Sequence, residues 1–116
     1  MGEDRRRLLI MVAGPYSAPT EEARTRNLRA MNDAAAAVAR RGHIPAIGVN
    51  AALPVLEAAG LPYTDPMMME ISLALAARCD ACLQIGRSPG ADREAAVIRG
   101  MGGPVYSSLD ELPSAQ

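Results

Sequence analysis

The sequence contains no phenylalanine, no tryptophan and no lysine, and it has only three tyrosines. Large aromatic side chains supply the largest buried areas in most cores, so the interior of this chain has to be built from Ala, Val, Leu, Ile and Met. With 116 residues, the chain is long enough for one domain and too short for two. Because a small alanine-rich core gains burial from a partner's surface, we expect a homodimer or a higher homo-oligomer.

The chain also lacks a large excess of charge and a long apolar run. Its formal net charge of −1 gives no general attraction to nucleic acid or to anionic membranes, and we expect neither as a partner. We interpret residues 1–7, which include three consecutive arginines, as a flexible leader; a nucleic-acid-binding patch is the alternative. No run approaches the roughly 20 apolar residues that cross a bilayer, and no secretion signal is visible, so we expect a cytoplasmic protein.

Cysteine and histidine are also scarce. The two cysteines, Cys79 and Cys82, have the C-x-x-C spacing of redox and zinc motifs. Redox chemistry favours this motif at the start of a helix, where the helix dipole stabilises a thiolate, but here a helix precedes it and a strand follows. A structural zinc ion needs further ligands, which the single histidine, His43, cannot complete. We therefore expect two reduced, packed thiols, no metal or other cofactor, and a solvated His43 in a turn.

Apolar runs alternate with amphipathic segments along the chain. Leu8–Ala13 and Asp80–Gly86 are short apolar runs typical of strands buried on both faces of a parallel sheet. His43–Gly48 is a weaker run, and its Pro45 favours a position near an edge of the sheet. Residues 104–108 predict a last strand.

Three helices are predicted between these strands from their capping residues. Thr20 is a good N-cap for a long helix, Asp65 followed by proline starts a second helix, and Ser88 followed by proline starts a third. Residues 49–64 are harder to interpret and predict only a short helix broken by Pro54 and Gly60.

This alternation predicts a single α/β domain over residues 8–108. We expect a three-layer α/β/α arrangement with a mainly parallel sheet of roughly five strands, flavodoxin-like or Rossmann-like. Residues 109–116 are polar and are expected to form a loose tail. Ligands of such folds bind beyond the carboxyl ends of the strands, where the strand order reverses. Residues 14–17, 48–50 and 86–91 occupy these ends and are expected to share one rim.

Two rim segments carry groups that suit a ligand. Backbone N–H groups at a helix start attract anions, Gly90 allows close approach to the backbone, and Ser88 offers a hydroxyl; a simple cap and turn is the alternative. After the first strand, Tyr16 can stack on a nucleobase, hydrogen-bond a carboxylate, or serve only in packing. Asn27, on the first helix, can point back and hold this loop.

Glu94 stands beside an apolar stripe. In the last predicted helix, Ala91, Ala95 and Ile98 recur at the spacing of an inward-facing stripe. Burial would raise the pKa of a carboxyl group at its border, whereas the helix start and nearby donors would lower it. An ionised carboxylate in a cleft can act as a nucleophile at the anomeric carbon of a sugar, as in retaining glycosidases. The alternative is a surface glutamate paired with a neighbouring arginine or helix.

These segments resemble the nucleoside 2-deoxyribosyltransferase-like superfamily, especially its short bacterial and phage members classed as domains of unknown function. AGPYS (13–17) with the helix after it is similar to the opening of that family, and SPGADREAAVIRGMGGPVY (88–106) is similar to its closing half. The similarity covers residues 9–107, which is nearly the whole domain.

The resemblance implies a site for nucleosides or their 5′-monophosphates. In relatives, the glutamate matching Glu94 attacks the ribosyl C1′ and expels the base, and another base or water resolves the glycosyl-enzyme. Ser88 matches a phosphate-contacting serine, and Tyr16 occupies the loop whose aromatic residue lies near the nucleophile. The further substrate-binding residues that we predict are Gly14, Pro15, Ser17, Asn50, Ser72 and Gly90.

Two positions depart from the family pattern. Relatives often carry an aspartate eight residues before the position of Asp80, where it handles protons on the leaving base, and this chain has Ser72 there. Glu70 can replace it only if the helix turns, because a two-residue offset changes the helical face by about 200°. Before Asn50, where relatives often have Pro-His, this chain has Ile47-Gly48.

The leading hypothesis is an enzyme that hydrolyses or transfers the N-glycosidic bond of a nucleoside or nucleoside 5′-monophosphate, with Glu94 as nucleophile and Tyr16 positioning it. The alternative, motivated by Ser72, is a non-catalytic nucleotide-binding module with a degenerate site. A third hypothesis is an adaptor whose Met67–Met69 patch contacts another protein, and burial of this patch in a homodimer is its competing interpretation.

Overall fold

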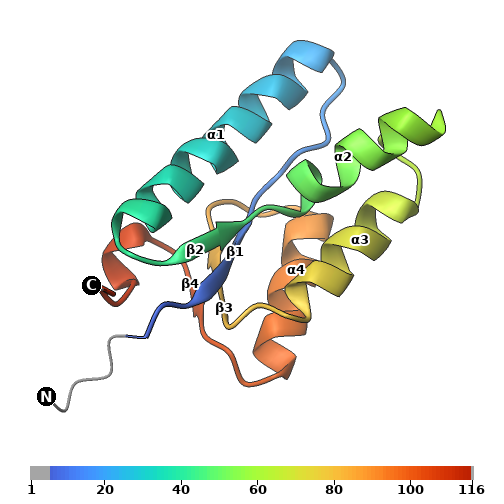
Figure 1. Ribbon diagram of the computed structural model, residues 1–116. Coiled ribbons are helices and arrows are strands. Elements are labelled where there is room, and N and C mark those ends of the chain that lie inside the picture. Colours follow the sequence, from blue (N-terminus) through green and yellow to red (C-terminus); the bar gives the residue numbers. More distant parts are fainter. Residues whose placement is uncertain (1–5, 116) are drawn as a thin grey trace, which may run out of the picture.

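The structure is a computed structural model of the chain and describes residues 6–115. Residues 1–5 of the expected leader and Gln116 lie outside the described residues. In chain order, the elements shown in Figure 1 are β1 (Leu9–Ala13), α1 (Glu21–Arg40), β2 (Ile44–Ala46), α2 (Gly48–Ala59), α3 (Met67–Ala76), β3 (Ala81–Gln84), α4 (Pro89–Gly100), β4 (Val105–Tyr106) and the short 3₁₀ helix η1 (Leu109–Glu111).

The four strands found in residues 6–115 form one parallel sheet in the order β2-β1-β3-β4. β2 pairs with one side of β1 and β3 with the other, so the strand order reverses between β1 and β3. β2 is an edge strand, as Pro45 predicted. The expected number of roughly five strands is wrong for the described residues, which form four strands, one from each of the four strand-like runs of the sequence.

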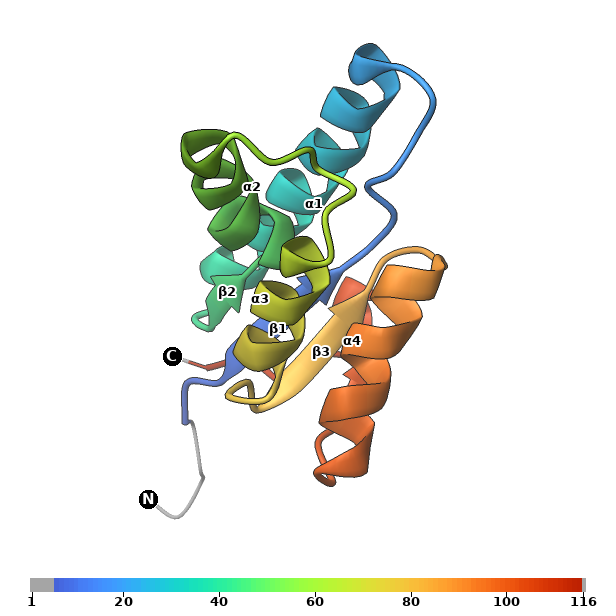
Figure 2. The same cartoon turned by 90° about the vertical axis from the view of Figure 1, so that its right-hand side faces the viewer.

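β1 is buried on both faces because helices cover both sides of the sheet. Ile10 and Val12 pack into a core cluster with residues of α1. Met11 and Ala13, which point the opposite way, pack into a second cluster with residues of α3 and α4. Figure 2 shows α4 running alongside β3, against which it packs.

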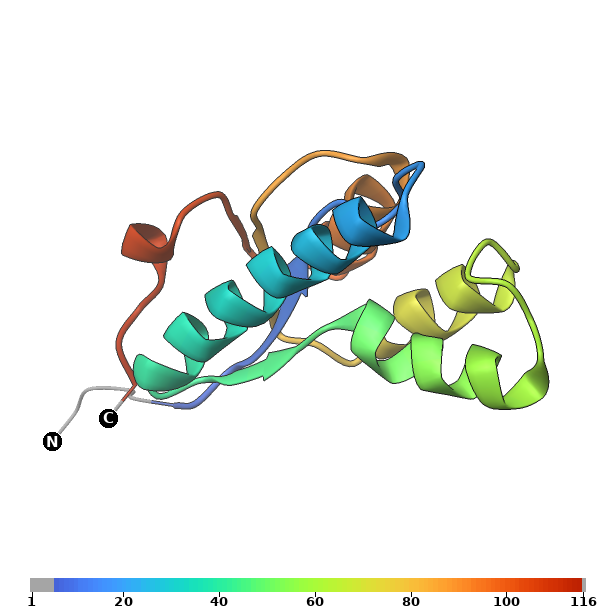
Figure 3. The same ribbon diagram turned by 90° about the horizontal axis from the view of Figure 1, so that it is seen from above.

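α2 and α3 pack mainly against each other, and Figure 3 shows this pair extending away from the sheet. α2 is one continuous helix, although Pro54 stands inside it and removes one backbone hydrogen bond. It ends at Gly60, whose left-handed conformation (φ 73°) suits glycine. The expected break at Pro54 is therefore wrong, whereas the expected break at Gly60 is confirmed as the end of the helix. Residues 48–50 form the first turn of α2, and Gly48 and Val49 line the rim.

Two of the three predicted helix starts are confirmed by hydrogen bonds. The Ala23 N–H donates to Thr20 Oγ1 (3.1 Å), and the Ala91 N–H donates to Ser88 Oγ (3.0 Å), so both side chains cap their helices. The third differs, because α3 begins at Met67 with Pro66 as its N-cap instead of Asp65, although the Met67 N–H donates to Asp65 Oδ1 (2.9 Å). Between residues 6 and 115, no helix has both the length and the apolar character needed to cross a bilayer.

The two cysteines are free and buried, as the sequence predicted. Burial raises the pKa of the Cys79 thiol to about 11 and that of the Cys82 thiol to about 12. Since the thiolate is the reactive form of cysteine, both side chains act as packing groups at neutral pH.

The C-terminal segment packs on the domain, contrary to the loose tail expected from its polar sequence. Leu112 and Ala115 are buried, and η1 contacts α1. The Ala115 N–H donates to the Arg41 carbonyl (2.9 Å), and a Cβ at Gly42 (φ 95°) would overlap the Ala115 carbonyl oxygen. Two apolar residues and one backbone hydrogen bond thus help to hold an otherwise polar segment on the domain.

His43 is buried, with 1% of its surface exposed, so the expectation of a solvated residue is wrong. The Leu8 N–H donates to Nδ1 (3.1 Å), which leaves the Nε2–H to donate to the Pro113 carbonyl. One imidazole therefore connects the start of β1, the start of β2 and the C-terminal segment. Next to it, Arg7 of the expected leader donates its Nε–H to the Gly42 carbonyl (2.8 Å).

Replacing His43 with alanine should lower the free energy of unfolding by about 2 to 4 kcal/mol, because it leaves a cavity and removes two hydrogen bonds from a buried position. Urea unfolding followed by circular dichroism measures the difference. Ser114→Ala, at an exposed position of the same segment, should stay within about 0.5 kcal/mol of wild type. A loss below about 1 kcal/mol for His43→Ala would mean that the imidazole does not hold the segment.

Candidate functional site

A cleft of about 830 Å³ lies at the carboxyl end of β1, beside the point where the strand order reverses. Parallel α/β folds bind their ligands at such reversal points. The walls come from the loop after β1, the start of α2, the α3 region and the start of α4. Seven residues that the sequence predicted for the site line this cleft: Gly14, Tyr16, Ser17, Ser72, Ser88, Gly90 and Glu94.

Glu94 lines the cleft with 7% of its surface exposed, so the alternative of a surface glutamate is wrong. Burial raises the pKa of the Glu94 carboxyl to about 7, and a hydrogen bond from Ser72 acts against this by lowering it. A carboxyl group with this pKa is partly ionised at neutral pH, and it can supply either a nucleophilic oxygen or a proton.

Ser72 approaches Glu94 from α3, and Gly48 at the start of α2 completes the contact. A Cβ placed on Gly48 would lie 2.7 Å from Glu94 Oε2 and 2.7 Å from Ser72 Cβ, closer than real Cβ atoms come to their neighbours. The three helices can meet here because residue 48 has no side chain. Sequence reasoning missed this role, since it placed Gly48 in a loop.

Tyr16 belongs to an aromatic pair that sequence reasoning missed. Its ring packs edge-to-face on Tyr63, with centroids 5.7 Å apart and planes at 86°, and both residues line the cleft. Asn27 Nδ2 donates to the Tyr16 carbonyl (2.9 Å), so the prediction that this side chain holds the loop is confirmed. The only signal for Tyr63 in the sequence is the scarcity of aromatic residues, because it lies in residues 49–64, which no pattern placed.

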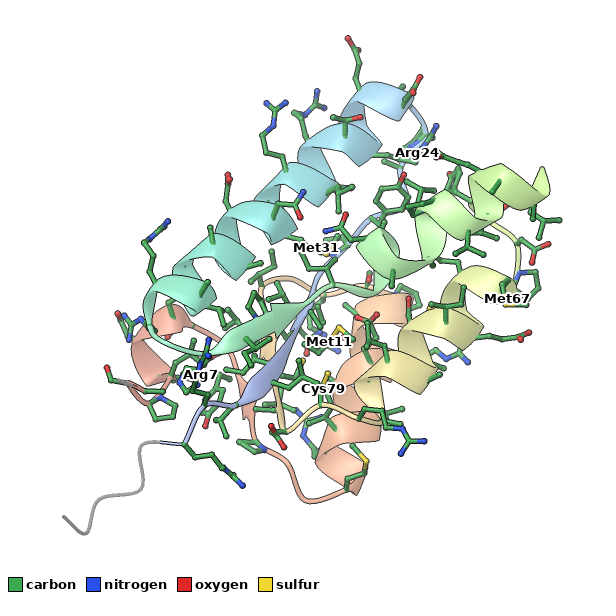
Figure 4. All side chains as sticks on the ribbon, viewed as in Figure 1. Arg7, Met11, Arg24, Met31, Met67 and Cys79 are labelled. Carbon is green, nitrogen blue, oxygen red and sulfur yellow. The ribbon has the colours of Figure 1, made fainter. Side chains whose placement is uncertain are left out.

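Arg24 packs on Tyr63 of the tyrosine pair. Its guanidinium lies over the Tyr63 ring, 4.4 Å from the centroid, and its Nη1 donates to the Ala18 carbonyl (2.9 Å). Figure 4 shows Arg24 between α1 and α2. A second hollow of about 480 Å³ lies there, and both tyrosines line it as well. The tyrosine pair thus borders two cavities.

The start of α4 is less open to a ligand than the sequence predicted. The Ser88 Oγ already accepts the Ala91 N–H as a helix cap, so its hydroxyl proton and one remaining lone pair are available to a ligand. A Cβ on Gly90 would lie 3.3 Å from Met69 Sδ, which shows that a methionine covers this glycine.

Pro15 and Asn50 are not among the residues that line the cleft. Asn50 donates through Nδ2 to Asn32 Oδ1 on α1 (2.7 Å), because residues 48–50 are helical and present its side chain toward α1. Pro15 packs on the loop after β3, where a Cβ on Gly86 would lie 2.9 Å from Pro15 Cδ.

Further charged groups line the cleft. Asp65 and Glu70 belong to the α3 region, and Arg93 belongs to α4. Among residues 6–115, no group of three or more His, Cys, Asp or Glu side chains is placed to hold a metal ion. The groups available for chemistry are therefore carboxyls, phenols, hydroxyls and one guanidinium.

Glu94→Gln should stabilise the protein at pH 8 and leave its stability almost unchanged at pH 4. The folded-state pKa of about 7 lies above the usual 4.5, so the folded protein binds the extra proton between these values, and stability falls as the pH rises through this window. The amide avoids a loss on the order of 3 kcal/mol. Urea unfolding at both pH values measures it.

Glu57→Gln is the matched control, because Glu57 is exposed on α2; its effect should not change between pH 4 and pH 8. Equal stability of wild type and Glu94→Gln at pH 8 would mean that ionisation of Glu94 costs nothing.

Comparison with known proteins assigns no family: no protein-family model matches the chain, and no curated protein matches it.

Proposed function

We propose that this protein hydrolyses or transfers the N-glycosidic bond of a nucleoside or a nucleoside 5′-monophosphate, with Glu94 as nucleophile. The observation that carries the proposal is the Glu94 carboxyl group, more than nine-tenths buried in a cleft where parallel α/β folds bind ligands. Acidic side chains are rarely buried to this extent unless they are paired or functional, and titratable groups with a displaced pKa gather at active sites.

The proposal includes membership of the nucleoside 2-deoxyribosyltransferase-like superfamily and a flavodoxin-like, three-layer fold. The strand order β2-β1-β3-β4 is that of a flavodoxin-like sheet without its fifth strand. The two core clusters, one on each face of the sheet, support three layers. Tyr16, Ser88 and Glu94, which carry the resemblance, line one cleft.

The reaction begins when one oxygen of the Glu94 carboxylate attacks the sugar C1′. A C–O bond forms, the C1′–N bond breaks, and its electron pair leaves with the base, which takes up a proton. Water or a second base then attacks C1′, the ester bond breaks, and the carboxylate is regenerated. Water yields the free sugar, and a second base yields a new nucleoside.

Asp65 and Glu70 are our candidates for delivering the proton that the leaving base needs. Ser72 stands where relatives usually have an acid, and Glu70 was expected on another face of the helix. Nevertheless, Asp65 and Glu70 both line the cleft. Either acid, once protonated, can donate to a base nitrogen. Tyr16 and Tyr63 offer aromatic surface on which a base can pack.

Incubation with a panel of nucleosides and their 5′-monophosphates should release free base, which chromatography detects. Glu94→Gln should lower the rate by about 1000-fold or more, because the amide cannot form the glycosyl-enzyme. Glu57→Gln should keep the wild-type rate, since Glu57 lies outside the cleft. Undiminished release by Glu94→Gln would reject the proposal.

The second candidate function is nucleotide binding without catalysis, and the absence of an acid at Ser72 favours it. Calorimetry would then show saturable binding while chromatography shows no free base after prolonged incubation. Any turnover that depends on Glu94 would exclude this candidate.

The proposal also includes a homodimer formed through the α2–α3 pair. Val55, Leu61 and Met67 there expose between 38% and 52% of their surface, and Figure 4 shows Met67 at the outer end of α3. A second copy would remove this apolar surface from water. Sedimentation velocity at micromolar concentration should give the mass of a dimer, and a strict monomer would contradict this part of the proposal.

A further inference from the structure

Three helices converge on one carboxyl group. Glu94 comes from α4, Ser72 from the middle of α3, and Gly48 from the first residue of α2. Ser72 is 2% exposed and Glu94 is 7% exposed, and both line the cleft. In the described part of the chain, no fully buried side-chain nitrogen or oxygen lacks a hydrogen-bond partner. Ser72 donates a hydrogen bond to Glu94 that lowers the pKa of this carboxyl group, and a Cβ at residue 48 would touch both side chains, which places them next to each other.

Gly48 sets the room available to this pair. A Cβ at residue 48 would stand 2.7 Å from Glu94 Oε2 and would come closer still to Ser72 Oγ. α2 also begins here without a capping side chain, and the free N–H groups of a helix start favour a nearby negative charge. The missing side chain of Gly48 leaves room for the Glu94 carboxylate, and the free N–H groups at the start of α2 favour its negative charge.

We propose that Ser72 is the positioning residue for the Glu94 carboxylate, and that the pair forms only because residue 48 carries no side chain. This inference rests on the proposed function and adds to it the group that controls protonation of the nucleophile. A hydroxyl that donates to a carboxylate favours its ionised, nucleophilic form. Burial favours the neutral form, so removal of the hydroxyl leaves burial unopposed.

Other titratable groups surround Glu94 but do not replace this hydrogen bond. The thiols of Cys79 and Cys82 interact with Glu94 electrostatically, and both stay neutral at pH 7 because burial raises their pKa values. The hydrogen bond that lowers the pKa of Glu94 comes from Ser72. The remaining titratable groups on the cleft are Tyr16, Tyr63, Asp65, Glu70 and Arg93.

A carbon-13 NMR titration of the glutamate carboxyls measures the pKa of Glu94 without substrate, and Glu94→Gln identifies its resonance. Ser72→Ala should raise this pKa by about one unit, the usual effect of losing a hydrogen bond to a charged group. Gly48→Ala should raise it at least as much, because the new Cβ separates the pair. Ser17→Ala is the matched control, since Ser17 is an exposed serine of the same cleft, and it should leave the pKa unchanged.

A second variant covers the case in which Gly48→Ala does not fold. The double variant Gly48→Ala/Ser72→Gly removes the two Ser72 atoms that the new Cβ would meet and leaves Glu94 Oε2, the end of a flexible side chain, as the contact that must shift. It should therefore fold and keep the raised pKa of Ser72→Ala. The positioning role is overturned if Ser72→Ala moves the pKa of Glu94 by less than about 0.3 unit. The requirement for glycine at residue 48 is overturned if Gly48→Ala folds and its Glu94 keeps the wild-type pKa.

Kinetics separates positioning from a merely structural role. In Ser72→Ala, the acid limb of kcat/KM should move to higher pH by the same unit, and the rate should recover at high pH. A structural defect would lower the rate at every pH. Since the titration needs no substrate, a failure to release base would reject the glycosidase proposal alone, and an unmoved pKa would reject the positioning role alone.

Discussion

The burial of one carboxyl group is the constraint on which the arrangement of α2, α3 and α4 depends. Moving an ionisable group out of water carries a large cost unless protein groups replace its hydration. Glu94 receives that replacement from Ser72, and the contact requires the missing side chain of Gly48. α2 and α3 pack mainly against each other, so this polar contact helps to fix them relative to α4. Folding stability therefore favours the neutral form of Glu94, whereas the proposed reaction uses its ionised form.

The scarcity of aromatic residues has a geometric counterpart in the core. The cluster between the sheet, α3 and α4 is built largely from alanines at positions 13, 76, 91 and 95. Small side chains let helices lie close to a sheet and to one another at normal packing density. This close approach brings the second turn of α4 next to the end of β1, where the cleft opens. The alanine-rich core therefore explains both the close packing of α4 on the sheet and the position of the buried Glu94 carboxyl group at the cleft.

The sequence predicted those features that local chemistry decides. The N-caps Thr20 and Ser88 and the doubly buried β1 follow from neighbouring residues, and so does the edge position of β2. Features that depend on residues distant in the sequence were not predictable. His43 is buried and hydrogen-bonds to the Pro113 carbonyl, and Tyr63 lines the cleft with its ring packed on Tyr16. Most of the candidate cleft was predictable because parallel strands bring their carboxyl ends together. The place of residues 48–50 at this rim was predicted as well, but their helical conformation was not, since residues 49–64 carry no clear period.

The hydrogen bond from His43 to Pro113 spans 70 positions of the chain, and Leu112 shares a core cluster with Ile10 and Val12 of β1. During synthesis, domains fold as units while the chain emerges at about 5 to 20 residues per second. The first strand of this domain therefore waits for residues 112–115 to leave the ribosome before its core can close.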